Sequence, residues 1–199
     1  MVALRKPVPP RMTVDEFLVW EPADRSGRLW QLIDGEPVAM APATENHGAL
    51  QAEIGRLIGN LLRAHRPGCR LIVTPGVVPR VRANRNFRIP DLGVTCAPAQ
   101  GTPMMTDPIL LIEVLSPSNE AETWNNIWSY VSIPSVTEIL ALRATRIEAE
   151  LLRRQPDGAW PAEPLLLRPG DSLELASIGL VVDLAAVYET TSLAGLQRA

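Results

Sequence analysis

Apolar residues recur at helical spacing between residues 44 and 65, and this is the clearest pattern in the chain. One stripe at this spacing consists of Leu50, Ile54, Leu57, Ile58, Leu61 and Leu62. Such a stripe is typical of a helix that buries one face, and Thr44 or Asn46 can cap its first turn. We therefore predict a helix over residues 44–65. His47 lies three residues before Leu50, so we expect it at the N-terminal end of the buried face.

Three apolar segments that follow this helix have the character of β-strands. With Pro- or Gly-containing connections between them, they span about residues 70–81, 87–96 and 109–116. The third reads ILLIEVL over residues 109–115, and a nearly continuous apolar run is typical of a strand that is covered on both faces. A second helix is predicted over residues 119–131, and another strand over residues 136–142.

This order of elements predicts an α/β (α+β) protein in which helices flank a central mixed β-sheet. Extra β-hairpins are expected outside this core. An Asp34–Gly35 turn is predicted to join two short strands over residues 29–40. A further hairpin is predicted over residues 146–153 with a turn at residues 156–158, and a closing strand and short helix over residues 179–187.

The length of 199 residues fits a single domain. A short helix over residues 14–20 is predicted to begin after Thr13, which can act as its N-cap. Residues 1–12 are predicted to form a flexible N-terminal tail and residues 191–199 a C-terminal tail, which leaves one domain over residues 13–190.

The composition narrows the class of protein. The net charge is −3, whereas proteins that coat nucleic acid non-specifically are usually basic. The chain has no apolar run long enough to cross a membrane, and no apolar run follows its basic N-terminal residues as in a secretory signal. Cys69 and Cys96 lie outside any CxxC spacing. We therefore expect reduced core thiols in a cytoplasmic protein.

Glu113 interrupts the apolar strand predicted over residues 109–116. A bare carboxylate is costly to bury unless a cation or hydrogen bonds compensate it. The simpler alternative is a glutamate at a strand end that is solvated or paired with an arginine. A strand this apolar gives water few routes to the group, so the sequence favours a functional site.

Asp91 interrupts an apolar segment in the same way, directly after Pro90. Alone, Pro-Asp is a weak signal that ordinary turn chemistry explains. An acid on each of two neighbouring strands is more informative, because paired carboxylates suit a hard cation such as Mg²⁺. Such an ion can polarise a phosphodiester.

Four arginines also precede Asp91 in one predicted hairpin, namely Arg80, Arg82, Arg85 and Arg88. Such a cluster could hold phosphates, although a solvated hairpin explains it at least as well.

Several segments together resemble the Uma-two family of proposed restriction endonucleases, within the PD-(D/E)xK nuclease superfamily. The resemblance rests on residues 30–36 (WQLIDGE), Ala41-Pro42 with His47, Ile89-Pro90-Asp91, residues 112–118 (IEVLSPS) and residues 179–184 (GLVVDL). It extends from about Met12 to Val187, nearly the whole chain. The EVLSPS segment together with the upstream Pro-Asp is fairly specific, whereas the LIDGE segment alone is not.

The resemblance implies a restriction-endonuclease-like core that cleaves nucleic acid, with DNA as the expected substrate and Mg²⁺ (or Mn²⁺) as the cofactor. It implies Asp91 and Glu113 as metal ligands, and Glu36 and His47 as further residues of the catalytic pocket. No membrane partner is expected, because the chain has no apolar run long enough to cross a bilayer. The sequence leaves open whether the chain acts as a monomer or as a homodimer.

The chain departs from the family pattern inside this pocket. Family members usually carry Tyr-Glu where this chain has Trp30-Gln31, and a lysine where it has Asn126, four residues before Tyr130. The only lysine in the chain is Lys6. Two interpretations remain. The protein is a metal-dependent endonuclease in which Asn126 orients water, or it is a degenerate nuclease-fold protein that acts as a binding or structural module.

Overall fold

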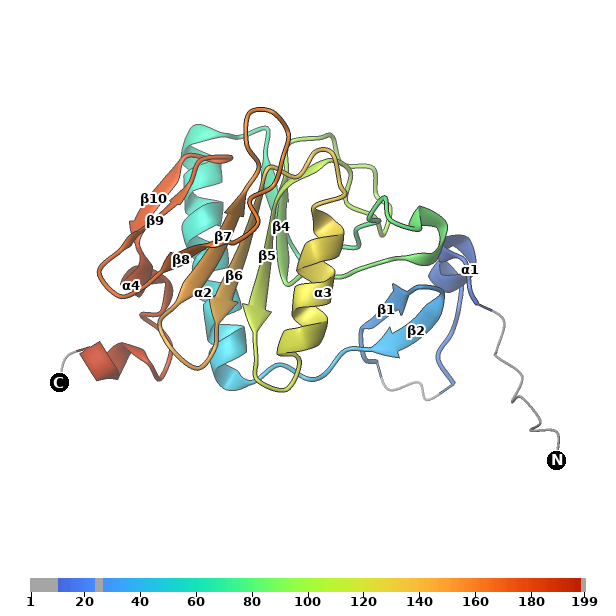
Figure 1. The fold of residues 1–199 in the computed structure, drawn as a ribbon, viewed down its shortest axis with the longest axis horizontal. Coiled ribbons are helices and arrows are strands. Elements are labelled where there is room, and N and C mark those ends of the chain that lie inside the picture. Colours follow the sequence, from blue (N-terminus) through green and yellow to red (C-terminus); the bar gives the residue numbers. More distant parts are fainter. Residues whose placement is uncertain (1–10, 24–26, 198–199) are drawn as a thin grey trace.

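A computed structural model describes residues 11–23 and 27–197 of the chain, and its centre is a six-stranded mixed β-sheet (Figure 1). In spatial order the strands are β3 (Arg70–Val73), β4 (Leu92–Thr95), β5 (Pro108–Leu115), β6 (Glu138–Arg143), β7 (Ala149–Arg153) and β8 (Leu165–Leu167). Only β5 and β6 pair in parallel. A parallel pair needs a crossover connection, and helix α3 (Glu120–Tyr130) provides it. The predicted mixed sheet flanked by helices is confirmed.

The sheet is covered by a helix on each face. Helix α2 (Glu45–His65) lies behind the sheet in Figure 1 and α3 lies in front of it. Side chains of β5 alternate between the two layers, so that Leu110, Ile112 and Val114 pack in the same core as α2. Leu111 and Leu115 pack with α3 instead. This alternation places Glu113 in the row of β5 that faces α3.

A hairpin and a short helix form a smaller core beside α3. The strands β1 (Trp30–Ile33) and β2 (Glu36–Ala39) pair as predicted across the Asp34–Gly35 turn. Both turn residues have a positive φ, 51° and 85°, as the tight turns of two-residue hairpins require. Helix α1 (Val14–Leu18) begins after a capping box at Thr13 and buries Val14 and Phe17. A 3₁₀ turn, η1 (Ala83–Arg85), follows later in the chain.

The C-terminal part of the chain packs over the outer side of α2. It contains β9 (Ser172–Leu175), β10 (Leu180–Asp183), α4 (Leu184–Val187) and the 3₁₀ turn η2 (Ala194–Gln197). Thr191 and Leu193, which fall in the segment predicted as a C-terminal tail, are buried. The predicted N-terminal tail falls mostly outside the described residues. No helix in the described ranges is both long and apolar enough to span a bilayer.

Several predicted strand boundaries differ from the structure. The strand predicted over residues 87–96 is regular only from Leu92 to Thr95, as β4. The strand predicted over residues 70–81 ends at Val73, because Thr74 adopts a positive φ of 46° that breaks the extended conformation. The turn at residues 156–158 lies in the long connection from β7 to β8. The hairpin partner of β7 is instead β6.

The prediction of reduced core thiols is wrong, because Cys69 and Cys96 form a disulfide. The antiparallel register of β3 and β4 pairs Arg70 with Thr95. One step further along both strands, the two cysteines meet across the sheet. The spacing of the two cysteines in the sequence does not reveal the disulfide, because the disulfide depends on the register of β3 and β4.

Gly76 offers a direct test of the packing around the loop that leaves β3. A Cβ at this position would lie 2.1 Å from Cζ of Phe87 and 2.7 Å from the carbonyl oxygen of Pro103. We expect Gly76→Ala to destabilise the fold by about 3 kcal/mol through overpacking. Urea denaturation of the variant measures this change.

The matched control is Gly59→Ala. Gly59 lies inside α2, and a Cβ there meets no atom within 4 Å. Alanine should therefore stabilise the helix by roughly 0.5–1 kcal/mol. Equal effects of the two substitutions would contradict the packing described here.

Candidate functional site

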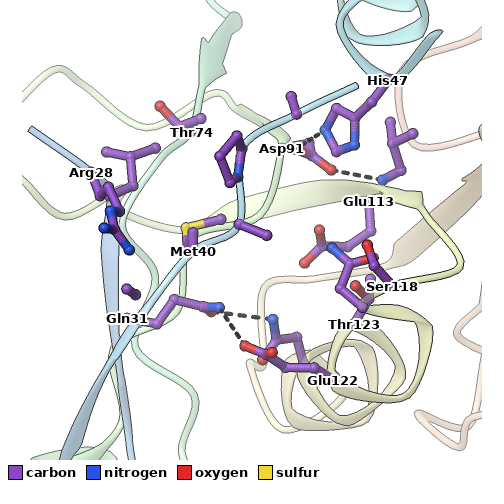
Figure 2. A pocket seen from close by; sticks show the side chains of 18 of the residues that line it. Arg28, Gln31, Met40, His47, Thr74, Asp91, Glu113, Ser118, Glu122 and Thr123 are labelled. Carbon is purple, nitrogen blue, oxygen red and sulfur yellow. Dashed lines mark hydrogen bonds and ion pairs between the residues drawn. The ribbon is translucent and has the colours of Figure 1, made fainter. Parts of the chain in front are cut away.

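Asp91 and Glu113 meet across two neighbouring strands. The antiparallel register pairs Leu92 with Ile112 and Gly93 with Leu111. The next step places Asp91 opposite Glu113, with both side chains on the face that α3 covers. Both acids are buried, with 7% and 5% of their surface exposed, and both line a cavity of about 500 Å³ (Figure 2). The prediction that the two acids converge on one face agrees with this geometry.

The Asp91 carboxylate is fixed by the end of the β4–β5 pairing. Strand β4 begins at Leu92, whereas β5 continues past its partner to Leu115. The backbone N–H of Val114 therefore has no β4 carbonyl opposite, and it donates to Asp91 Oδ2 at 2.7 Å. From α2, the amide of Gln51 donates to the Asp91 carbonyl at 2.9 Å. Backbone and side chain of Asp91 are thus both held.

His47 supplies the second contact to this carboxylate. Its Nε2 lies 2.7 Å from Asp91 Oδ1 (Figure 2). Thr44 caps α2 by accepting a hydrogen bond from the His47 backbone N–H, which sets the histidine in the first turn of the helix. The positive end of the helix dipole also points toward the acids there. The structure thus places His47 in the cavity, as its position along the apolar stripe predicted.

Glu113 receives its hydrogen bond from α3. The Tyr130 hydroxyl donates to Glu113 Oε1 at 2.6 Å, and both groups are buried. Burial, followed by the negative charge of Asp91, raises the pKa of Glu113 well above its ordinary value, and the Tyr130 hydrogen bond opposes this rise. Like charges this close repel each other. A cation between them would relieve the same repulsion.

A chain of amides and one further acid borders the cavity opposite His47. Asn126 donates from Nδ2 to Gln31 Oε1 at 3.2 Å, and Gln31 donates from Nε2 to Glu122 Oε1 at 3.4 Å. Gln31 Oε1 also accepts from the Ile89 backbone N–H at 3.4 Å. Asn126 therefore does border the cavity that contains Glu113. Its amide is engaged with the hairpin rather than with either acid.

Glu36 lies apart from the other predicted site residues. Its side chain is exposed, and it is absent from the cavity lining. The hairpin register pairs Glu36 with Ile33, whereas Gln31 pairs with Val38. Glu36 thus lies two positions closer to the turn than the part of the hairpin that borders the cavity. The prediction that Glu36 lines the pocket does not fit this register.

Sequence reasoning missed two residues that hold the acids, Tyr130 and Gln51. Each follows a predicted site residue by one helical turn, since Tyr130 is four residues after Asn126 and Gln51 four after His47. That spacing was visible in the sequence. The periodicity gave the face of each helix, but it could not show which carboxylate each side chain reaches.

The four arginines before Asp91 do not form one cluster. Arg80, Arg82 and Arg85 are exposed, and Arg82 pairs with Asp34 in the hairpin turn. Arg88 is buried. The segment therefore offers an exposed basic loop and, separately, one interior guanidinium.

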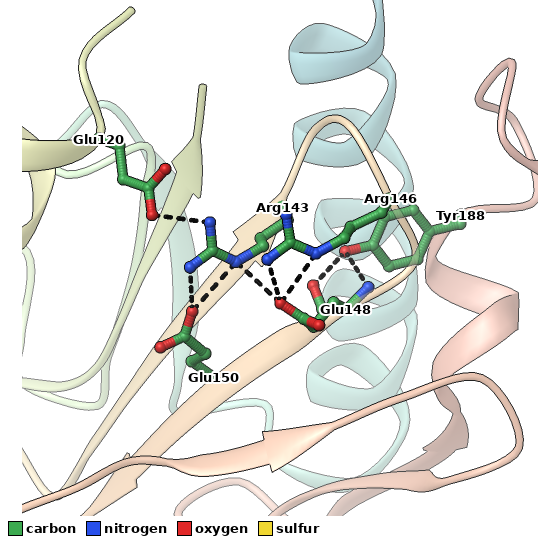
Figure 3. A network of polar contacts seen from close by, with 6 residues as sticks. All are labelled: Glu120, Arg143, Arg146, Glu148, Glu150 and Tyr188. Carbon is green, nitrogen blue, oxygen red and sulfur yellow. Dashed lines mark hydrogen bonds and ion pairs between the residues drawn. The ribbon is translucent and has the colours of Figure 1, made fainter. Parts of the chain in front are cut away.

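Helix α3 is anchored at its start by a network around Arg143 (Figure 3). Arg143, at the end of β6, forms ion pairs with Glu120 on α3 and with Glu148 and Glu150 on the β6–β7 hairpin. Several mutually supporting pairs contribute more than one exposed pair would. The network fixes the end of α3 from which Glu122 and its neighbours line the cavity.

The donor set suits a hard cation with few protein ligands. Asp91 and Glu113 present oxygen atoms, and each oxygen that accepts one hydrogen bond still has a lone pair. Within residues 11–23 and 27–197, no group of three or more His, Cys, Asp or Glu side chains is arranged to hold a metal ion. A pair of carboxylates therefore differs from a zinc site, which has three or four protein ligands. It fits Mg²⁺, which commonly binds through one or two carboxylates and keeps several waters.

The chain resembles known proteins along most of its length. Residues 14–185 match the Uma2 family, described as "Putative restriction endonuclease". An uncharacterized protein of Synechocystis sp. is 30% identical over 182 residues, which cover 90% of this chain and 92% of that protein. A crystal structure from Anabaena variabilis, described as a putative nuclease belonging to DUF820, has a TM-score of 0.73 at 16% identity, over 89% of this chain and 98% of that one.

The Anabaena structure shows the fold of the chain, and the family match shows its family. The Anabaena structure shares the fold of this chain, with its central mixed sheet and flanking helices. The family match covers β5 with Glu113, Asp91 directly before β4, and both helices that hold the acids. The predicted family is confirmed, and the chain belongs to the Uma2 family of restriction-endonuclease-like proteins.

Proposed function

We propose that the protein is a metal-dependent endonuclease that hydrolyses phosphodiester bonds of nucleic acid, with DNA as its substrate. The observation that carries this proposal is the buried pair of Asp91 and Glu113, which face each other at a cavity. Membership of the Uma2 family supports a nuclease activity. The fold shared with the Anabaena protein is consistent with it.

Each residue has a distinct task in this proposal. Asp91 and Glu113 would hold Mg²⁺ or Mn²⁺. His47 and the Val114 N–H keep the Asp91 carboxylate in one orientation, and Tyr130 does the same for Glu113. The bound ion would supply Lewis acidity toward a phosphodiester and stabilise the charge that develops on the leaving oxygen. Asn126 can orient water, because an amide both donates and accepts hydrogen bonds.

The charge of the cavity supports metal dependence. Asp91, Glu113 and Glu122 all line it, and three carboxylates would repel a phosphate group. A divalent cation reverses this local charge. Arg28 lines the cavity on the side across from Glu113 (Figure 2), and the exposed arginines of residues 80–85 offer further contacts for a phosphate backbone.

A binding or structural module remains the second candidate. Its support is the neutral Gln31–Asn126 pair, where an ammonium group would have offset the acids directly. In that case the cavity would keep its shape and bind a cation without cleaving nucleic acid. Cleavage and cation binding must therefore be measured separately.

The first test replaces each acid by its amide. Wild-type protein should melt at a higher temperature with Mn²⁺ or Mg²⁺, because a cation at 100 times its Kd adds about 2.7 kcal/mol to the free energy of unfolding. Asp91→Asn and Glu113→Gln should abolish this gain and also abolish nicking of supercoiled plasmid. Thermal melting and gel electrophoresis provide the two readouts.

Glu163→Gln is the control, because Glu163 is exposed in the connection before β8. It should leave both readouts unchanged. A cation-dependent shift that survives in Asp91→Asn and Glu113→Gln would place the cation elsewhere and overturn the proposed site. A shift without nicking in wild type, on plasmid and on single strands, would favour the binding module.

His47 should affect cation binding through Asp91. Removing a partner that orients a metal ligand typically lowers the metal affinity about 10- to 100-fold. We expect His47→Ala to lower the affinity for Mn²⁺ by that factor, as measured by isothermal titration calorimetry, while the free protein still folds. His47→Gln can still donate a hydrogen bond, so it should lose less. Unchanged affinity in His47→Ala would show that the contact does not orient Asp91.

A further inference from the structure

The cavity combines a buried acidic floor with an exposed lip. Asp91 and Glu113 lie on the floor and are buried. The lip comes from two segments beside the β1–β2 hairpin, residues 27–29 before β1 and residues 40–43 after β2. These residues line the same cavity, and all of them are exposed except Met40, which is half-buried. A ligand that reaches the acids therefore lies against this lip.

Most of the lip is apolar. Leu29 has 45% of its surface exposed, and it packs in none of the three apolar cores of the described residues. Residues 40–43, which read Met-Ala-Pro-Ala, continue the apolar surface on the other segment. Arg28 and Met40 lie across the cavity from Ser118 (Figure 2). An apolar surface beside a few polar groups is typical of a site that holds part of a ligand.

The charge of the lining does not suit a DNA duplex. Among the described residues, Arg28 is the only lysine or arginine that lines the cavity, whereas Asp91, Glu113 and Glu122 line it too. The exposed arginines of residues 80–85 lie outside the lining. A duplex presents two phosphate backbones and is held mainly by Lys and Arg. Its bases stack on one another, so an apolar lip cannot reach their faces.

The size of the cavity also favours an unpaired strand. Its volume is about 500 Å³, within the range of pockets that hold one small molecule. A single nucleotide unit is of that size, whereas a duplex is wider. Enzymes that act on nucleotides in confined pockets take them from single strands or extrude them from the duplex. Unpaired bases also expose the faces that apolar and aromatic side chains can contact.

We propose that the cavity takes one unpaired nucleotide, so that the substrate is single-stranded or locally unpaired DNA rather than a regular duplex. The scissile phosphate would lie over Asp91 and Glu113, and a neighbouring base would lie on Leu29, Met40 and Pro42. Supercoiled plasmid can still be nicked, because negative supercoiling promotes local unpairing. The proposal rests on the proposed function and deepens it by naming the substrate class.

Binding tests the substrate class without cleavage. A short fluorescent single strand and the duplex of the same sequence are titrated with wild-type protein and followed by fluorescence anisotropy, with Ca²⁺ as a cation that binds oxygen ligands. The single strand should bind at least about tenfold more tightly, because the duplex must first unpair. Equal affinities, tighter binding of the duplex, or no binding of the single strand would overturn the proposal.

Leu29→Ser tests the lip. Because Leu29 is exposed, the variant should melt like wild type, yet its affinity for the single strand should fall at least about threefold through lost apolar contact. The matched control is Val181→Ser on β10, since Val181 is also an exposed aliphatic residue, with 65% of its surface exposed, and does not line the cavity. The control should bind the strand like wild type. Equal affinities of the two variants would overturn the proposed contact with the base.

Cleavage with Mn²⁺ separates the substrate class from the proposed function. Wild type should nick supercoiled plasmid and cut single strands, whereas the same plasmid after linearisation should be cut at least about tenfold more slowly. If linear plasmid is cut as fast as the other two, the nuclease proposal stands and the proposed substrate class fails. If the single strand binds more tightly but no DNA is cut, the cavity binds unpaired DNA and the nuclease proposal fails.

Discussion

The structure around the cavity depends on one unfavourable arrangement, the two carboxylates of Asp91 and Glu113 facing each other in the interior of the sheet. Burial and the charge of Asp91 both oppose the charge of Glu113 and raise its pKa. Each acid is therefore held by groups from other elements. The Val114 N–H and His47 hold Asp91, and Tyr130 holds Glu113. Without these contacts, the register of β4 and β5 would place two like charges together with nothing to orient them.

The fold supplies these contacts through the ends of its elements. Strand β4 starts one residue after Asp91, which leaves the Val114 N–H for the carboxylate. Helix α2 starts beside the same acid and presents His47 in its first turn. Helix α3 is anchored at Glu120, borders the cavity with Glu122, Thr123 and Asn126, and reaches Glu113 with Tyr130. The sheet fixes where the acids are, and the two helices fix how they point.

Much of this arrangement could be predicted from the sequence, because burial imposes periodicity. The apolar stripe after Thr44 predicted α2 and the place of His47, and single acids inside apolar strands marked Asp91 and Glu113. Periodicity gives the face of an element but not its partner. The hydrogen bonds of Tyr130 and Gln51, and the disulfide between Cys69 and Cys96, depend on how distant elements align.

The same limit explains the errors. Glu36 lies in a motif that directly follows Gln31, which lines the cavity. The hairpin register nevertheless places Glu36 next to the turn and away from the cavity. From the sequence, Arg88 was predicted to be one of four basic residues in a hairpin. Its pairing with Val77 instead buries it. In both cases a shift of one or two residues along a strand decides the environment of a charged group.

The most direct test of the account is the position of a bound cation. Crystals grown with Mn²⁺ should show an anomalous diffraction peak between Asp91 and Glu113, with an oxygen of each carboxylate as a ligand. The metal–oxygen distances should be near those of Mg²⁺, about 2.1 Å. A peak at another site, or none beside these acids at a saturating Mn²⁺ concentration, would contradict the claim that this buried pair is a divalent-cation site.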